Sequence, residues 1–210
     1  MILQADWCVG EILAQLDRLT LTGETLVIFT SDNGPVVDDG YRDDAVEKLG
    51  LHRPGGSLRG GKYSSFEAGT RVPFITRWPG RIAPGVSDAL VCQVDFPASF
   101  AALVGGGLGA DDAPDSFNVL PALLGESPDG REHLVEHART LSLREGAWKL
   151  IEAGKGPAVF DNTDIESGIF PEPALFHLAE DLGEQRNLAA KYPERVASMS
   201  RRLEEIKQRG

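Results

Sequence analysis

Two short segments carry residues whose types and spacing suit the binding of an anionic group beside a cation. The first is Asp32-Asn33-Gly34, which follows the apolar run Thr25–Thr30 after one residue, Ser31. Ligands of open α/β sheets bind beyond the carboxyl ends of strands, and the oxygens of Asp32 and Asn33 suit a hard cation such as Ca²⁺ or Mg²⁺. The same three residues are also a common turn sequence. No alternating strand follows Gly34 to complete a hairpin, which weakens the turn interpretation.

The second segment is Leu58–Tyr63, in which two glycines precede Lys62. Glycines let an anion approach backbone amides, and the lysine is a compact cation with movable donors that suits a tetrahedral oxyanion. Arg59 and Arg71 are further candidate anion ligands. The spacing of a phosphate-binding P-loop is absent, so a solvated loop with surface cations is the alternative. His52, shortly upstream, either faces a substrate or is an exposed loop histidine.

The elements that would position these segments form an α/β arrangement. We expect an amphipathic helix over Ile2–Leu19, because its apolar residues recur at helical spacing. The run Thr25–Thr30 predicts a strand buried on both faces, as in a parallel sheet. Residues 31–71 form a long loop rich in Gly, Pro and Asp, and such loops are more often functional than inert. Val72–Trp78 predicts a second strand, and Asp95–Val104 predicts a short helix capped by Asp95.

The pattern changes at Ser127–Gly130, which predicts a boundary between a domain over residues 1–128 and another over residues 129–210. After it, His133–His137 and Ala174–Leu178 predict strands, and residues 140–152 predict a hairpin. Four residues spaced three, four and three apart give one apolar face to a final helix that begins at Pro193: Val196, Met199, Leu203 and Ile206. The second domain is therefore expected to be a small antiparallel sheet with one helix packed on it.

Charge and composition narrow the classes of partner. The formal net charge is −11, so the long-range field repels polyanions and argues against a nucleic-acid partner. No apolar run has the length of a membrane span, and the first residues carry acids where a secretory signal would carry bases. The cellular compartment is not determined by these features. Cys8 and Cys92 form no zinc-binding pattern, and we expect both to be small buried residues.

Together these segments resemble the sulfatase family, in its arylsulfatase branch. No single block is decisive, but their common order is hard to obtain by chance. Seven blocks carry the resemblance: Asp6–Thr30 leading into T-S-D-N-G, Arg59–Lys62 with Glu67–Pro73, Arg77–Gly80 with Pro84-Gly85, Asp95–Pro97, Asp115–Phe117, Leu143–Leu150 and Gly183–Leu188.

The resemblance implies part of an alkaline-phosphatase-like α/β sandwich, followed by a small α+β subdomain with an antiparallel sheet and a C-terminal helix. It implies that Asp32 and Asn33 are two ligands of an active-site Ca²⁺, with Mg²⁺ as the other candidate. It also implies that Lys62 contacts the sulfate oxygens and the nucleophile. Ala68 stands where the family commonly has glycine, a small departure.

The larger departure from the family pattern concerns the nucleophile. The family makes formylglycine from Cys or Ser in a C/S-x-P/A-x-R motif, and neither Cys8 nor Cys92 lies in one. The family's remaining metal-binding aspartates and leaving-group residues belong upstream of such a segment. We therefore expect a partial site that is inactive in the isolated chain, which corresponds to roughly the second half of such an enzyme.

Three functions stay open at this point. The leading one is part of a sulfatase that hydrolyses sulfate esters. The second is a fragment of a phosphoester or phosphonate-ester hydrolase of the same superfamily, and the third is a non-catalytic binding module. We also expect the chain to self-associate or to need a missing N-terminal half, because unpaired strands and uncovered apolar side chains invite association.

Overall fold

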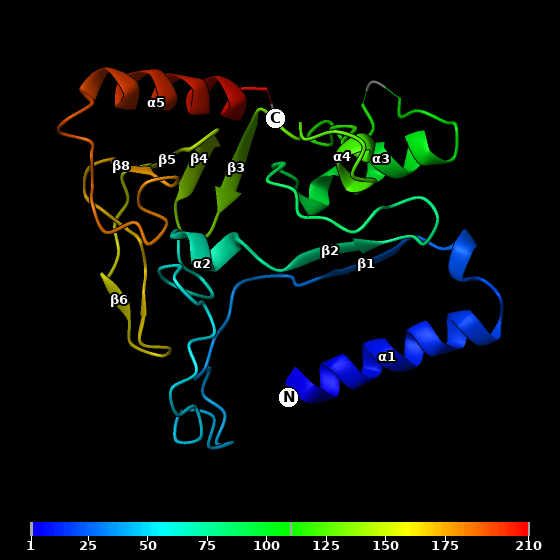
Figure 1. Ribbon diagram of the computed structural model, residues 1–210. Coiled ribbons are helices and arrows are strands. Elements are labelled where there is room, and N and C mark those ends of the chain that lie inside the picture. Colours follow the sequence, from blue (N-terminus) through cyan, green and yellow to red (C-terminus); the bar gives the residue numbers. More distant parts are fainter. Residues whose placement is uncertain (1, 110, 210) are drawn as a thin grey trace. The chain divides into compact units, whose positions relative to one another are not determined.

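Two structural units share the chain, and neither is continuous in sequence. The computed structural model describes residues 2–109 and 111–209 (Figure 1). Unit 1 comprises Met1–Thr30 and Phe74–Arg131, and unit 2 comprises Ser31–Pro73 and Glu132–Gly210. These units describe how segments of this chain pack, so the domain boundary after residue 128 stays a prediction. None of the helices in the described ranges is both long enough and apolar enough to span a membrane.

Unit 1 contains a two-stranded ribbon, β1 (Val27–Thr30) and β2 (Phe74–Arg77). The strands pair antiparallel, with Val27 opposite Arg77. The prediction of a strand buried on both faces of a parallel sheet is therefore wrong for this chain. Within the described residues β1 has a single strand partner, so its side chains stay partly accessible and Phe29 is 40% exposed.

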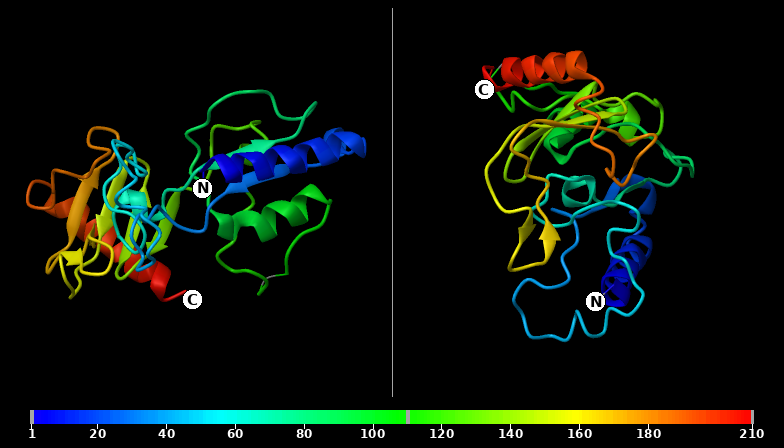
Figure 2. Two further views of the ribbon diagram at one scale, coloured as in Figure 1. Left: turned by 90° about the horizontal axis from the view of Figure 1, so that it is seen from below. Right: turned by 90° about the vertical axis from the view of Figure 1, so that its left-hand side faces the viewer.

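Helices lie on both sides of this ribbon (Figures 1 and 2). On one side is α1 (Ile2–Arg18), which confirms the predicted amphipathic helix although none of its residues is buried. Cys8 is exposed and Cys92 half-buried, so the expectation of two buried cysteines is wrong. On the other side is α3 (Phe96–Leu103), where the ring of Phe96 lies 6.1 Å from that of Phe74. The remaining short helices of unit 1 are η1 (Thr22–Glu24), η2 (Gln93–Asp95) and α4 (Leu120–Leu123).

Asp95 occupies the N-cap position of α3, as predicted, but its side chain does not cap this helix. Instead the carboxylate accepts hydrogen bonds from the backbone amides of Cys92 and Phe117, at 3.1 and 2.9 Å, and pairs with Arg131 at 2.6 Å. A buried carboxylate is stabilised by such donors, and here they connect three separate loops of unit 1.

Unit 2 is built on an antiparallel four-stranded sheet in the order β3-β4-β5-β8. The strands are β3 (His133–His137), β4 (Leu141–Glu145), β5 (Trp148–Ile151) and β8 (Ala174–His177). A small ribbon, β6 (Val159–Phe160) with β7 (Ile165–Glu166), lies in the connection between β5 and β8. The final helix α5 spans Pro193–Lys207. The predicted small antiparallel sheet with one C-terminal helix is confirmed.

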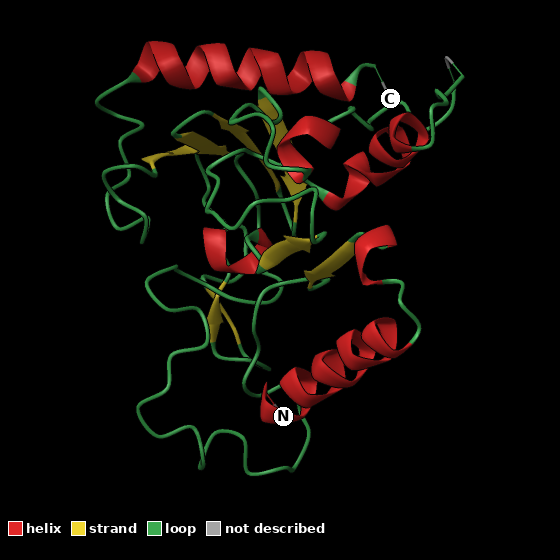
Figure 3. Ribbon diagram, turned by 45° about the vertical axis from the view of Figure 1, so that its right-hand side comes forward, coloured by secondary structure: helices red, strands yellow, loops and turns green. Residues whose placement is uncertain are grey.

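Each face of this sheet has its own apolar cluster. On one face α5 places Met199 and Leu203 against Leu143, Leu150 and Leu175. The opposite face carries a second cluster of Phe66, Ile151, Ala174, Phe176 and Leu178. Phe66 directly precedes the one-turn helix α2 (Glu67–Thr70), so α2 is packed against the face opposite α5 (Figure 3).

Backbone segments approach one another very closely around α2. The amide of Gly34 donates to the carbonyl of Gly69 at 2.9 Å. A Cβ atom on Gly34 would lie 1.6 Å from the carbonyl oxygen of Ala68, and one on Gly69 would lie 2.0 Å from that of Ser64. Only glycine fits at either position, because the neighbouring atoms belong to the backbone and cannot rotate away.

We predict that Gly34→Ala lowers the free energy of unfolding by about 1–3 kcal/mol, because the new methyl group forces the two backbones apart. The matched control is Gly55→Ala in the same unit, where the nearest atom to a new Cβ would be 3.4 Å away. This control should stay within about 0.5 kcal/mol of the wild type. Urea unfolding of both variants tests the prediction, and equal stabilities would contradict it.

Candidate functional site

The predicted metal ligands lie just beyond the end of β1. Asp32 is exposed and Asn33 is half-buried. The Oδ1 atom of Asp32 accepts a hydrogen bond from the Asn33 amide at 3.0 Å, and the Asn33 side-chain nitrogen donates to the Gly34 carbonyl at 2.9 Å. Asp32 Oδ2 and Asn33 Oδ1 accept no hydrogen bond from any part of the chain that the structure describes. Both oxygens are therefore available to a ligand.

The ligand types of Asp32 and Asn33 suit a hard cation, but two ligands are fewer than such a cation needs. A carboxylate and an amide oxygen are ligands that Ca²⁺ prefers, but Ca²⁺ takes six to eight oxygens. Over residues 2–109 and 111–209, no group of three or more His, Cys, Asp or Glu side chains is arranged to hold a metal. The chain thus offers a partial ligand set.

Lys62 lies beside this segment, because a backbone hydrogen bond joins its loop to Pro35. Its amide donates to the Pro35 carbonyl at 2.9 Å. A Cβ atom on Gly61 would lie 2.7 Å from the same carbonyl oxygen, so the backbone at Gly61 and the backbone at Pro35 are in direct contact. The ammonium of Lys62 lies 5.3 Å from the centre of the Tyr63 ring, and no carboxylate among the described residues forms an ion pair with it. A half-buried cation without an anionic partner is suited to binding one.

Arg59 is not available as an anion ligand, contrary to what its position suggested. Its guanidinium donates two hydrogen bonds to the carboxylate of Glu166, at 2.8 and 2.5 Å, and a third to the carbonyl of Glu184 at 2.7 Å. It also lies 4.1 Å from the ring centre of Phe66. These hydrogen bonds raise the pKa of Arg59 and lower the pKa of Glu166. Arg59 therefore fixes the loop that carries Lys62.

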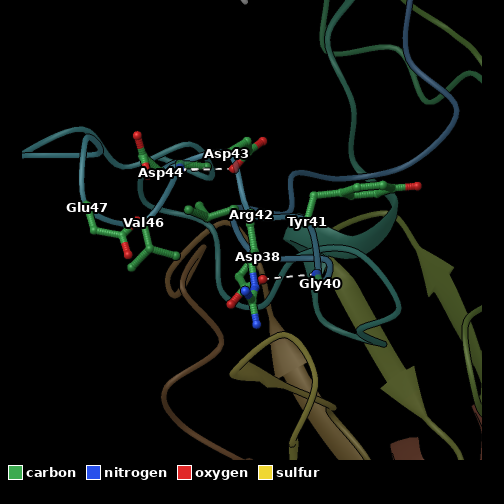
Figure 4. Close-up of a pocket in the computed structure, with 10 residues that line it drawn as sticks. Asp38, Gly40, Tyr41, Arg42, Asp43, Asp44, Val46 and Glu47 are labelled. Carbon is green, nitrogen blue, oxygen red and sulfur yellow. Dashed lines mark hydrogen bonds between the residues drawn. The ribbon is translucent and has the colours of Figure 1, made fainter.

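His52 and the acidic loop stay apart from these contacts. His52 is exposed, and its backbone amide donates to the carbonyl of Leu49. The loop over residues 37–47 surrounds an open hollow of about 490 Å³ (Figure 4). Asp38 and Asp43 accept hydrogen bonds from amides of their own loop, and Asp44 pairs with Lys48 at 2.7 Å. These contacts stabilise the loop, and its carboxylates belong to no group arranged to hold a metal among the described residues.

A buried charge cluster beneath α2 was not foreseen from the sequence. Lys149, on β5, is fully buried and contacts Glu67 at 2.9 Å, Glu136 at 3.1 Å and Glu184 at 3.8 Å. Glu184 also accepts a hydrogen bond from the Glu67 amide at 2.6 Å. The available signal was a lysine inside the apolar strand Trp148–Ile151. Such a lysine needs carboxylate partners that only the fold can identify.

The pKa values of this cluster follow from burial and mutual charge. Burial alone would lower the pKa of Lys149, but the charges of Glu136, Glu67 and Glu184 raise it above its usual range. Burial would raise the pKa of Glu136, but Lys149 and hydrogen bonds from Thr70 and Ser142 lower it overall. For Glu184 burial is the larger effect and raises the pKa to about 7, although Lys149 opposes it.

The chain is similar in sequence to the proteins of one known family. The family model described as "Sulfatase" matches residues 1–106. An N-acetylgalactosamine-6-O-sulfatase of Bacteroides thetaiotaomicron is 48% identical over 211 residues, which cover 100% of this chain and 41% of that protein. Human arylsulfatase A is 34% identical, over 89% of this chain and 38% of its own length. The chain thus spans less than half the length of these curated relatives.

Solved structures show the same similarity. A structure from a study of the metabolism of multiple glycosaminoglycans by Bacteroides thetaiotaomicron is 48% identical, with a TM-score of 0.96 over 99% of this chain and 44% of that one. A phosphonate monoester hydrolase of Agrobacterium radiobacter is 19% identical, with a TM-score of 0.63 over 100% of this chain and 40% of that one, and shows the shared fold alone. The predicted alkaline-phosphatase-like α/β class is thereby confirmed, over part of the length of these structures. On the family match and these relatives, the chain belongs to the sulfatase family.

Proposed function

We propose that this chain is the C-terminal part of a sulfate-ester hydrolase, in which Asp32 and Asn33 contribute to a Ca²⁺ site and Lys62 binds the sulfate group. The observation that carries the proposal is the direct backbone contact between Pro35 and Lys62. It keeps Oδ2 of Asp32, Oδ1 of Asn33 and the Lys62 ammonium, which have no hydrogen-bond or ion-pair partner among residues 2–109 and 111–209, on adjoining segments of chain. Such a pairing suits a divalent anion that must be held and polarised.

The mechanism we propose for these residues is electrostatic. Bound Ca²⁺ would supply Lewis-acid polarisation of a sulfate oxygen. Lys62 would donate hydrogen bonds to other sulfate oxygens, where negative charge increases as the ester bond breaks. Asp32 and Asn33 would hold the cation, and His52 would contact the organic part of the substrate. Formylglycine, the family nucleophile, has no precursor motif in this chain, so the attacking group must come from another segment.

For the substrate we propose a sulfated amino sugar. The support is the 48% identity to an N-acetylgalactosamine-6-O-sulfatase across this whole chain. The likeness to a phosphonate monoester hydrolase is one of fold at 19% identity, so it gives the phosphoester alternative no specific support. The alternative of a non-catalytic binding module would use the same residues. The ligand oxygens and Lys62 would then bind a sulfate ester without cleaving it.

Activity of a chimera tests the catalytic proposal. This chain would replace the matching 41% of the Bacteroides relative. We expect the chain alone to be inactive on sulfated N-acetylgalactosamine or a chromogenic aryl sulfate with Ca²⁺, and the chimera to be active. Lys62→Ala in the chimera should lower kcat by about 10²–10³-fold, as loss of a preorganised donor does.

The control for this chimera is Lys155→Ala, which changes an exposed lysine of the same unit. It should leave kcat unchanged. A folded chimera without activity, or one that Lys62→Ala leaves unchanged, would count against the proposal. Turnover by the chain alone that survives repurification and disappears in Lys62→Ala would show that the chain holds its own nucleophile.

Calcium affinity of the isolated chain should be weak, about millimolar, because two protein oxygens are a small part of a Ca²⁺ shell. Isothermal titration calorimetry of the wild type, Asp32→Ala and the exposed control Asp39→Asn measures it. We expect only Asp32→Ala to remove the binding. Micromolar affinity would mean that further ligands lie within this chain.

We also propose that α1 is an association surface, either for a second copy or for an N-terminal half. Four of its apolar residues are 58–86% exposed: Ile2, Leu3, Trp7 and Ile12. Large apolar side chains exposed together on one helix mark a candidate association site. We expect light scattering coupled to size exclusion to show self-association, and Trp7→Ser with Ile12→Ser to reduce it. A monomer at all concentrations would contradict the proposal.

A further inference from the structure

The helix α2 connects the two segments of the candidate site. The carbonyl of Gly69, near its end, accepts the hydrogen bond from Gly34, which directly follows the two ligand residues. The amide of Ala68, in its middle, donates to the carbonyl of Arg59 at 2.9 Å, at the start of the loop that carries Lys62. A displacement of α2 therefore changes the position of one site segment against the other.

Buried side chains outside α2 hold it in place. A helix of four residues, Glu67–Thr70, is not stable by itself and depends on tertiary contacts. Glu184 accepts the hydrogen bond of the Glu67 amide at 2.6 Å, and Lys149 donates to the Glu67 carboxylate at 2.9 Å. Glu67, Lys149 and Glu184 are each 0% exposed. The position of α2 thus depends on charges inside unit 2.

Glu184 is the least compensated of these charges. Lys149 approaches Glu67 and Glu136 within 3.1 Å, but its distance to Oε1 of Glu184 is 3.8 Å, too long for a hydrogen bond. This Oε1 atom is buried and has no hydrogen-bond partner in the described structure. A buried, unpaired carboxylate oxygen is costly when ionised, and protonation removes that cost.

Charged groups from every neighbouring element surround Glu184. Further cations lie one step away: Arg71 and Arg144 are each 3.5 Å from Oε2 of Glu67. The groups that face the cluster are Lys149 from β5, Glu136 from β3, Arg144 from β4, Glu67 and Arg71 at α2, and Arg59, which binds the Glu184 carbonyl.

We propose that Glu184 is a positioning residue, and that its protonation state sets how firmly α2 holds the Asp32–Asn33 segment and the Lys62 loop. When Glu184 is neutral, Lys149 is shared between Glu67 and Glu136 alone. When Glu184 ionises, its Oε2 atom accepts a stronger hydrogen bond from the Glu67 amide. Its Oε1 atom then also competes for Lys149, and we take this weakening of the Lys149–Glu67 contact as the larger effect on α2. The site should be most firmly held on the acid side of neutrality. This inference concerns the geometry of the segments and does not depend on sulfate hydrolysis.

The direction of the pH effect follows from the pKa of Glu184, which burial raises from 4.5 to about 7. Between these values the folded state keeps a proton that the unfolded state has lost. The contribution of Glu184 to stability is therefore fully present below pH 4.5, decreases as the pH rises towards 7 and is lost above it. Glu136, whose pKa is lowered, acts in the opposite sense in more acid solution.

The test is a pH titration of the full chain by NMR, with hydrogen exchange of assigned amides. The carboxyl carbon of Glu184 should titrate near neutrality. The amides of Gly34 and Ala68 should shift with the same midpoint and lose protection above it. In Glu184→Gln, which keeps the shape without the charge, this transition should vanish and the acid-side protection should persist at all pH values.

The matched control is Glu180→Gln, because Glu180 is an exposed carboxylate in the same loop with a side chain 70% exposed. It should leave the transition unchanged. A Glu184 carboxyl that titrates near its usual value would overturn the proposal. So would a Gly34 amide that does not follow the Glu184 carboxyl, or a transition that survives Glu184→Gln. The wild-type measurement alone decides the question if the variant does not fold.

Discussion

The ion pair between Lys149 and Glu67 is the interaction on which the rest of unit 2 depends. Both side chains are fully buried, and their nitrogen and oxygen are 2.9 Å apart. Removing one partner of such a pair leaves an uncompensated buried charge, which is strongly destabilising. The pair joins the four-stranded sheet to a helix of one turn, and that helix in turn holds both segments of the candidate site. The geometry of the candidate site therefore depends on electrostatics in the interior of unit 2.

Close packing of backbone adds a second constraint to this charge pair. Gly34 and Gly69 allow α2 to lie in direct contact with the chain that follows β1, at distances that exclude any side chain. The arginine and the lysine of the Arg59–Lys62 segment then have different tasks. Arg59 is fully engaged by Glu166 and the Glu184 carbonyl, whereas Lys62 forms no ion pair with any carboxylate that the structure describes. One cation fixes the loop, and the other is available to a ligand.

Much of this arrangement could be predicted from the sequence, because it rests on local patterns. Apolar spacing predicted α1 and α5, and the pattern over residues 140–152 predicted the β4–β5 hairpin. The residue types at Asp32-Asn33-Gly34 and Arg59–Lys62 predicted a site for a cation beside an anion, and this stays a prediction. The order of the motifs indicated the family, which the comparisons confirmed. Each of these signals is read along the chain, from the types, spacing and order of its residues.

Only the tertiary structure decided which residues face one another. The apolar run of β1 suited a parallel, fully covered strand, but its partner is the antiparallel β2 and one side stays accessible. The role of Arg59 depended on Glu166, which lies 107 residues away in the chain. The partners of Lys149 come from three other segments of the sequence. Such contacts leave no local pattern, because a buried charge is satisfied by whatever the fold brings to it, and that information exists only in three dimensions.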